Sequence, residues 1–425
     1  MITLSQARLQ LLSRYHDCIE SQLRNKSCTY KAAYLVYDII RLLLKYIGYF
    51  SSLFLRVTKK EQVDIVVVFD SMIDYQRSKS IWDGLKNKCY RIKPLTLDFT
   101  LARLAPLYIR KSPQIPYRIY MWACYAAMIK KQYNPKMLCI YQGCDVWPVF
   151  MRHEMQDTGP TVFIPHAIHP PFYLYTCIDF DYYLAFGQSA IDSLKSNTIR
   201  IGHTNVILTG SPLIDSSFSL APNKEKKHLL FFSDWWIEQD IKNTRKNFAI
   251  LIQWAQKHPE YTVYIKLHPL EKGYYVKEQI RNIPNMIMLP KETSFVDACS
   301  TSSAVITSWS VASVEAALLN RPTIVVNHIP YDENSHDYIA SDKFLYLEKY
   351  FPRRATTAEE LDERIQQMMN NFDYYLDNCR EFIQYHIEKT TGSQDYVISV
   401  LDNILQAKMD NIPTFTLEEK TDGLE

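Results

Sequence analysis

The sequence predicts an α/β protein with two domains, each built around a doubly wound parallel sheet with helices on both faces. Short apolar runs of strand length, such as VDIVVVF at 63–69, alternate with amphipathic helical patterns along most of the chain. A polar segment at 216–227 separates two such alternating blocks. The 425 residues exceed one ordinary domain, and 47% of them are apolar, which is enough for large cores.

The first block, at about 61–215, is expected to be an N-terminal Rossmann-like domain. Its predicted strands are 63–69, 89–95, 136–141, 161–165, 182–186 and 206–209. The helical patterns between them are clearest at 74–88, 117–132 and 188–196. Strands and helices that alternate at this spacing are typical of a doubly wound sheet.

The second block, at 228–356, repeats this alternation and predicts a C-terminal Rossmann-like domain. Its expected strands are 228–232, 262–267, 286–289, 304–307 and 323–326, and its helices are 237–257, 274–281, 294–299 and 310–320. Residues 357–409 should form helices that pack back across both domains, and the acidic segment 410–425 should be a flexible tail. Together these features describe the GT-B architecture, in which ligands bind outside the C-terminal strand ends, in the cleft between the domains.

Composition excludes several classes of protein. The net charge of +2 gives no support to nucleic-acid binding. Nine scattered Cys without a CxxC pair favour a reducing, cytoplasmic compartment and argue against a zinc or disulfide framework. Neither GxGxxG nor GxxxxGK[ST] occurs, which argues against nicotinamide-dependent enzymes and P-loop NTPases.

Residues 1–60 form a basic N-terminal segment of predicted helices, with ten Lys/Arg and three Asp/Glu, a net charge of +7 (ten minus three). Within it, 32–57 is strongly apolar, but its polar residues recur every three or four positions and form one stripe on a helix: Asp38, Arg41, Lys45, Gly48, Ser52 and Arg56. A transmembrane helix would carry these charges through hydrocarbon at roughly 2.5–3.5 kcal/mol each. We therefore expect a helix on the inner face of the cytoplasmic membrane or one packed on the protein body.

The segment 307–326, TSWSVASVEAALLNRPTIVV, predicts a strand end, a Ser-rich turn, a helix and a buried strand. The turn brings Ser308, Ser310 and Ser313 to the start of the helix, where unpaired N–H groups and the helix dipole favour an anion such as a phosphate. Glu315, one turn into the helix, is placed to accept hydrogen bonds from a ribose or sugar hydroxyl.

A second polar strand end follows the predicted strand 262–267. Lys266 and His268 alternate onto the same face of the extended chain, and Pro269 ends the strand. Ser233 follows the strand 228–232, where backbone amides commonly approach a donor phosphate. Strand ends of this kind in one α/β unit predict a nucleotide-diphosphate site and therefore a transferase.

The order of these motifs resembles that of bacterial CDP-glycerol glycerophosphotransferases and related capsule and cell-surface polysaccharide transferases of GT-B fold. The family's Lys-x-His-Pro element, Ser pair, acidic helix residue and Pro-x-Ile-Val strand match Lys266–Pro269, Ser308 with Ser310, Glu315 and Pro322–Val325. The resemblance implies that Lys266, His268, Pro269, Ser308, Ser310 and Glu315 bind the donor. Ser313 and Ser233 are added to them by their positions in the Ser-rich turn and after the strand 228–232.

The resemblance covers about 160–330. Its Thr-Gly-x-Pro-x-x-Asp element matches Thr209–Asp215, which adds Gly210 and Ser211 to the donor-binding residues that it implies. The family turn usually reads Asp-Tyr-Ser-Ser, whereas this chain has Ser-Trp-Ser-Val at 308–311. That difference leaves sugar transfer open beside transfer of a polyol phosphate.

The catalytic base is expected in the first domain. The family has a His-Gly at a place comparable to His166, with the His proposed as base, and an imidazole titrates near neutrality. His169 is an alternative, as is Asp145, whose carboxylate can act as a base if its pKa is raised. A structural or phosphate-contacting role for His166 and a helix-capping role for Asp145 stay open.

The expected reaction moves a sugar or polyol phosphate from a nucleotide diphosphate or monophosphate donor to a cell-surface polysaccharide, such as a capsule, or to a lipid-linked glycan. No cofactor or metal is expected, because Asp179-Phe180-Asp181 runs directly into the strand 182–186, and Lys266 and His268 would supply the positive charge. The alternatives are a sugar-nucleotide 2-epimerase of the same fold, which usually has a Gly-rich nucleotide turn, and a non-catalytic scaffold in polysaccharide assembly.

Overall fold

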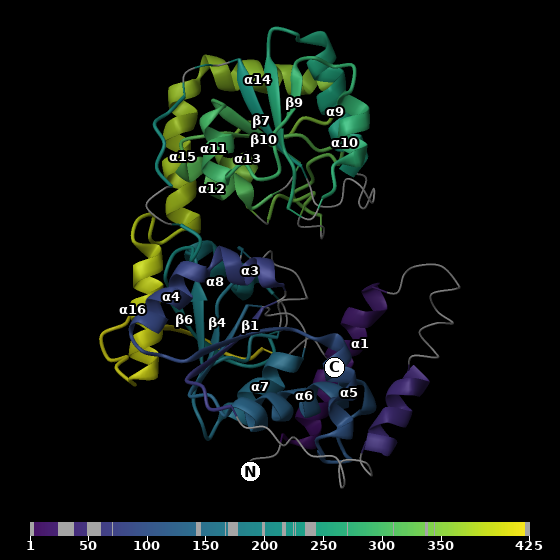
Figure 1. Ribbon diagram of the computed structural model, residues 1–425. Helices are drawn as coiled ribbons and strands as arrows, with labels where there is room; N and C mark the ends of the chain where they lie inside the picture. Colours follow the sequence, from purple (N-terminus) through teal and green to yellow (C-terminus); the bar gives the residue numbers. More distant parts are fainter. Residues whose placement is uncertain are drawn as a thin grey trace. The chain divides into compact units, whose positions relative to one another are not determined.

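The computed structural model describes residues 4–23, 38–48, 61–69, 71–141, 146–165, 167–168, 177–197, 200–214, 218–223, 225, 227–233, 244–269, 271–308, 310–335, 339–343 and 345–420. The chain divides into two compact units (Figure 1). Unit 1 comprises Met1–Leu213 and Ser393–Glu425, and unit 2 comprises Ile214–Gly392. The chain therefore leaves unit 1 beside the predicted linker and returns to it after unit 2.

Unit 1 contains a seven-stranded sheet in the order β12-β6-β5-β4-β3-β1-β2. Its strands are β1 Ile65–Phe69, β2 Ile92–Thr96, β3 Met137–Ile140, β4 Thr161–Phe163, β5 Tyr182–Ala185, β6 Thr204–Leu208 and β12 Phe415–Leu417. All neighbours are parallel except β12, which runs antiparallel to β6. β1 lies inside the sheet and is buried throughout, as its continuous apolar run predicts.

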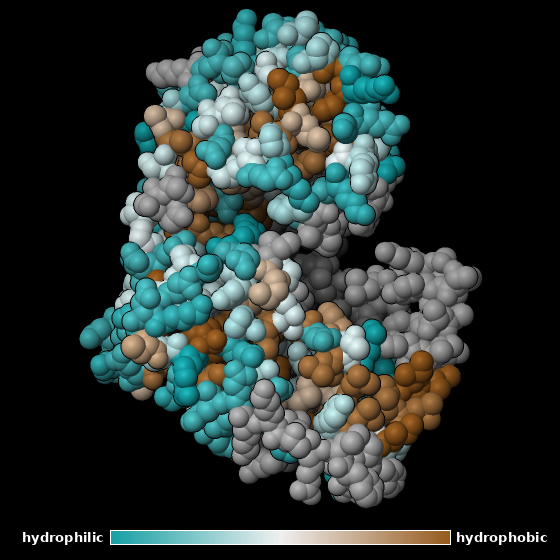
Figure 2. Space-filling view, viewed as in Figure 1, coloured by the Kyte–Doolittle hydropathy of each residue, from teal (hydrophilic) through white to brown (hydrophobic). Residues whose placement is uncertain are grey.

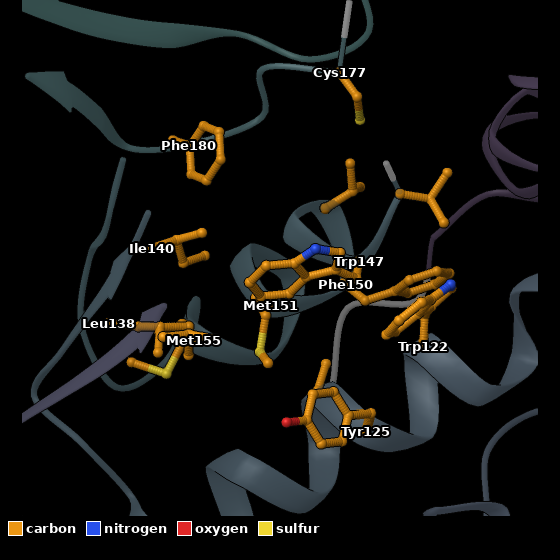
Figure 3. Packing of buried hydrophobic residues seen from close by; sticks show 14 of the residues in the cluster. Trp122, Tyr125, Leu138, Ile140, Trp147, Phe150, Met151, Met155, Cys177 and Phe180 are labelled. Atoms are coloured by element: carbon orange, nitrogen blue, oxygen red, sulfur yellow. The ribbon is translucent and has the colours of Figure 1, made fainter. Parts of the chain in front are cut away.

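Helices cover both faces of this sheet. They are α1 Gln6–Leu23, α3 Met72–Arg77, α4 Lys79–Asn87, α5 Phe99–Leu104, α6 Tyr117–Tyr133, α7 Trp147–Met155, α8 Gln188–Ser196 and α16 Ser393–Leu405, with a 3-10 turn at Ala105–Leu107 and a further helical segment at 38–48. Val66 and Val68 of β1 pack with α1, α6 and α7, whereas Ile65, Val67 and Phe69 pack with α4 and α16. Figure 3 shows the first core, where aromatic side chains of α6 and α7 gather beside β3.

Unit 2 contains a five-stranded sheet in the order β11-β10-β7-β8-β9, and all of its strand pairs are parallel. Its strands are β7 His228–Phe232, β8 Thr262–Lys266, β9 Met286–Met288, β10 Ala304–Thr307 and β11 Thr323–Val325. Its helices are α9 Thr244–Lys257, α10 Tyr274–Ile280, α11 Phe295–Ser300, α12 Ala312–Leu318, α13 Leu347–Tyr350, α14 Ala358–Asn370 and α15 Phe372–His386. Because every strand runs the same way, all of the C-terminal strand ends meet at one edge of the sheet.

These two sheets, parallel except for β12, confirm the predicted α/β fold class. The helices expected over 357–409 divide between the units, because α14 and α15 belong to unit 2 and α16 belongs to unit 1. Within the residues that the structure describes, no helix is long and apolar enough to cross a membrane.

The prediction of a flexible tail over 410–425 is wrong as far as Lys420. Leu417 of β12 is buried and pairs with Thr204, and Lys420 and Arg200 exchange two backbone hydrogen bonds of 2.7 and 2.8 Å. Glu419 forms an ion pair with Arg8 of α1. The acidic composition concealed a strand that covers the otherwise open edge of β6.

Candidate active site

Several of the predicted site residues follow neighbouring strands of the unit 2 sheet. Ser233 comes after β7, Lys266 ends β8, and Ser308 comes after β10. The sheet order places β7 between β10 and β8. These strand ends are therefore adjacent at the C-terminal edge, where open α/β sheets bind their ligands.

Lys266 and His268 share one face of the chain, as predicted. Partly exposed and buried residues alternate along β8, and the alternation continues through buried Leu267 to partly exposed His268. The Lys266 ammonium donates a hydrogen bond of 2.8 Å to the carbonyl oxygen of Lys291, and burial lowers the pKa of Lys266. The cation is thus held against the segment that follows β9.

Ser233 is bonded directly to this element. Its hydroxyl accepts a hydrogen bond of 2.9 Å from the backbone N–H of His268, and its own N–H donates to the carbonyl oxygen of Lys266 at 3.1 Å. The N–H of Glu271 then donates to the carbonyl oxygen of His268, which closes a turn around exposed Pro269. The structure therefore brings Ser233, Lys266 and His268 together at one strand end, joined by hydrogen bonds.

The Ser-rich turn is built by its own hydroxyl groups. The Ser310 hydroxyl accepts from the N–H of Ala312 at 3.2 Å, and the Ser313 hydroxyl donates to the carbonyl oxygen of Ser310 at 2.7 Å. Ser308 is buried, and its hydroxyl oxygen has no hydrogen-bond partner among the described residues. Glu315 lies in the first turn of α12 and is partly exposed. Among the three serines of this turn, Ser308 is thus the one whose hydroxyl forms no hydrogen bond with the described residues.

One polar pair at the same edge was missed by sequence reasoning. His328 follows β11, and both its backbone N–H and its Nδ1 lie within hydrogen-bond distance of Asn247 Oδ1 on α9, at 2.9 and 2.8 Å. Because an amide oxygen only accepts, Nδ1 carries the proton and Nε2 is the acceptor. Burial, together with Lys246, lowers the pKa of His328, which favours this neutral form. His328 could have been predicted as a polar residue shortly after a predicted strand, here β11, in the same way as Lys266 and His268. No local sequence pattern points to Asn247.

Gly210 and Ser211 form a buried turn after β6 in unit 1. Gly210 has φ of 77°, a left-handed conformation that favours glycine, and its N–H donates to the carbonyl oxygen of Phe186. The Ser211 hydroxyl accepts from the N–H of Leu213 at 3.2 Å. These bonds stabilise the turn, and donor binding by the two residues stays a prediction.

The candidate bases His166, His169 and Asp145 lie outside the described residues. The strands that precede them in sequence, β4 and β3, are parallel neighbours in the unit 1 sheet, with Ile140 paired to Phe163. The choice between the three candidates therefore stays a prediction.

Asp179 and Asp181, the one DxD pair that the sequence analysis considered, are engaged within unit 1. Asp179 pairs with Arg152 and Arg8, and Asp181 accepts hydrogen bonds from the N–H and hydroxyl of Thr161 at 2.8 and 2.9 Å. Across the described ranges, no group of three or more His, Cys, Asp or Glu side chains is arranged to hold a metal ion.

Residues 181–401 match the model of the CDP-Glycerol:Poly(glycerophosphate) glycerophosphotransferase family. This stretch is 221 of the 425 residues (401 − 181 + 1), more than half of the chain. The chain belongs to this family. It is therefore a transferase, and the resemblance drawn from its motifs is confirmed. The match includes the strand ends of unit 2 and begins after the three candidate bases.

Comparison with solved structures supports the same fold. The UDP-GlcNAc 2-epimerase from Neisseria meningitidis bound to UDP-GlcNAc superposes with a TM-score of 0.52 and 14% identity, over 80% of this chain and 100% of that one. MnaA of S. aureus with UDP gives 0.52 and 13% over 84% and 99%, and the calicheamicin glycosyltransferase CalG4 gives 0.50 and 10% over 82% and 99%. At these identities the likeness shows the GT-B fold alone. No curated protein sequence matches the chain significantly.

Proposed function

We propose that the chain transfers a sugar or polyol phosphate from a nucleotide-activated donor to a cell-surface polysaccharide or lipid-linked glycan, such as a capsule. In this proposal, the C-terminal edge of the unit 2 sheet holds the donor. The observation that carries it is the set of polar groups on the adjacent ends of β8, β7 and β10, within the residues that match the family.

Each of these groups suits one part of a nucleotide donor. Lys266 and His268, on one face of the chain, would contact the phosphates, and the ammonium would stabilise the charge that develops on the leaving nucleotide. A buried hydroxyl without a partner is destabilising by about 1–3 kcal/mol, so Ser308 is the group in its turn that a bound phosphate would satisfy. Glu315 would accept from a ribose or sugar hydroxyl. We propose His166 as the catalytic base.

We also propose that the chain acts at the inner face of the cytoplasmic membrane, where lipid-linked acceptors are found. The net charge of +7 over residues 1–60 supports this location, because anionic lipids attract such segments. Sedimentation with anionic vesicles should be strong at low salt and weaker at high salt. Equal recovery in the supernatant with and without residues 1–60 would refute the location.

A donor panel tests the reaction. CDP-polyols and CDP- and UDP-sugars would be incubated with the full chain and glycan or lipid-linked acceptors, and the products followed by mass spectrometry. The family name specifies CDP-glycerol, and two of the structural neighbours were solved with UDP-GlcNAc or UDP, so both nucleotides belong in the panel. Transfer by the wild type and loss of donor binding in His268→Ala are expected.

Two other results would contradict this proposal. Exchange of the C2 proton of a UDP-N-acetyl sugar in heavy water, without transfer, would indicate a 2-epimerase. Binding of nucleotides without turnover of any donor would indicate a scaffold.

A further inference from the structure

The helix at 38–48 turns its charged residues toward the rest of unit 1. Asp38 accepts a hydrogen bond of 3.1 Å from Arg118 of α6, and Arg41 is buried. The Lys45 ammonium donates to the carbonyl oxygens of Pro113 and Ile115 at 2.8 and 2.7 Å. The polar stripe that the sequence analysis identified is therefore the face that docks on the protein.

Gly48 fits the same docking. A Cβ atom at this position would lie 2.6 Å from the carbonyl oxygen of Pro106, so only glycine allows the approach. Ile40, Arg41 and Leu44 line a small cavity of about 30 Å³ together with residues of α5, the 3-10 turn and α6. The helix at 38–48 and α5 are thus neighbours in one layer.

The opposite side of this helix is apolar and faces outward. With the neighbouring α5 it forms what we call the apolar face, whose residues are between 38% and 57% exposed: Ile39, Ile40, Leu42, Leu43, Tyr46, Ile47, Phe99, Leu101 and Leu104. These are nine of the sixteen large hydrophobic residues that are exposed in the described part of the chain. Figure 2 shows a brown area at the lower right, over the helix at 38–48 and α5.

This arrangement reverses the usual rule for a helix on a water-soluble protein. Turning charges inward requires partners for them. Arg118 of α6 donates to Asp38, and carbonyl groups of the segment before α6 accept from Lys45. Arg41 forms an ion pair of 3.8 Å with Asp38 of its own helix. A contiguous apolar area of this kind is rare on a surface that faces water and marks an interaction site. The fold keeps these apolar side chains on the outside at the expense of burying charges.

We propose that the apolar face inserts into the headgroup–acyl boundary of an anionic bilayer. Outside the helix at 38–48, residues 1–60 carry eight Lys/Arg and two Asp/Glu, a net charge of +6 (eight minus two), which complements anionic lipids. Tyr46 supplies an amphipathic ring of the kind that lies at membrane interfaces. The helix lies in the interface rather than crossing it. This inference rests on the proposed location and names the surface responsible.

Vesicle binding by the full chain tests the proposal. Phosphatidylcholine vesicles with and without phosphatidylglycerol would be sedimented with the wild type and with Leu43→Glu/Ile47→Glu. We expect the double variant to bind more than about tenfold more weakly, since burial of a single Leu or Ile side chain is worth roughly that factor. The matched control is Ile287→Glu/Tyr374→Glu, which changes exposed apolar residues of unit 2 and should bind like the wild type.

Hydrogen exchange locates the contact. Peptides that cover 38–48 and 99–104 should exchange more slowly when vesicles are added, whereas peptides of α14 should not change. Thermal unfolding of both double variants should match that of the wild type, because all four positions are exposed.

Two results would overturn the proposal. One is equal vesicle binding by the two double variants. The other is a dimer that forms through the apolar face without vesicle binding, which would assign the face to a second copy of the chain. Turnover with a soluble acceptor should survive in Leu43→Glu/Ile47→Glu. If the wild type itself shows no turnover, the proposed reaction is wrong, but the vesicle experiment still tests whether the apolar face binds lipid.

Discussion

In unit 2, polar groups gather at one edge of the sheet, whereas in unit 1 the helix at 38–48 hides its charged residues and exposes its apolar ones. At the unit 2 edge, hydrogen bonds that involve the backbone join Ser233 to Lys266 and His268. The apolar face gathers nine exposed large hydrophobic residues from the helix at 38–48 and α5. The two surfaces therefore differ in the ligand that we propose for each, which is a phosphorylated donor at the unit 2 edge and lipid at the apolar face.

The largest effect that we predict tests whether the catalytic base is a residue of unit 1. His166→Ala should lower kcat by about 10²–10⁴-fold, the range for loss of a general base, with donor affinity nearly unchanged. His268→Ala should instead weaken donor binding, because it removes a contact made in both the ground and transition states. Steady-state kinetics and donor titration separate the two. Near-normal turnover in His166→Ala, with loss in Asp145→Asn or His169→Ala, would move the role to one of those residues.

The next effect tests whether the edge of unit 2 holds an anion. Lys266→Met keeps most of the side-chain stem but removes the ammonium, and should raise the donor Kd about 10- to 100-fold, since a charged hydrogen bond contributes about 1.5–3 kcal/mol. Lys277→Met, at an exposed position on α10, is the matched control and should bind the donor normally. Calorimetric titration with CDP and UDP measures both. If Lys266→Met binds CDP and UDP as tightly as the wild type does, the donor phosphates do not contact Lys266.

A third prediction concerns a titrating group inside unit 2. Burial lowers the pKa of His386 from 6.5 to about 4, and its Nε2 contacts the carbonyl oxygen of Leu345 at 3.0 Å. Below pH 6.5 His386 is protonated in the unfolded chain, whereas in the folded chain it stays neutral until about pH 4. The free energy of unfolding therefore decreases as the pH falls from 6.5 to about 4. Between pH 7 and 5 the loss should be roughly 2 kcal/mol.

The control for this prediction is His386→Gln, whose amide can still donate to Leu345 but does not titrate. Urea unfolding at both pH values should show the wild type losing more stability than the variant. A parallel loss in the two proteins would mean that His386 is not responsible for the pH dependence.

The sequence predicted those features that depend on neighbouring residues. Continuous apolar runs identified strands such as β1 and β7. Lys266 and His268 were identified because they are polar residues at the end of a predicted strand. What it missed depends on distant partners. β12 pairs with a strand about 200 residues earlier, and its acidic surroundings concealed it.

The polar stripe at 38–48 is a similar case. Its spacing showed that Asp38, Arg41 and Lys45 share a side of the helix. Only the partners contributed by Arg118, Pro113 and Ile115 reveal that this side faces inward. Periodicity defines which residues lie together, but it does not decide which side meets the protein.

The smallest effect tests how far the donor site extends along the unit 2 edge. His328→Ala should raise the donor Kd by about two- to tenfold, because a neutral hydrogen bond contributes about 0.5–1.5 kcal/mol. Asn247→Ala should have part of the same effect, since Asn247 orients the ring through Nδ1. The two changes share one interaction, so the double variant should bind little more weakly than His328→Ala alone. His328→Gln, which keeps an acceptor near the Nε2 position, should recover some affinity. If the losses of donor affinity in the two single variants add up in the double variant, Asn247 acts independently of the His328 ring. An unchanged donor Kd in His328→Ala would show that the donor site does not extend from β10 to β11.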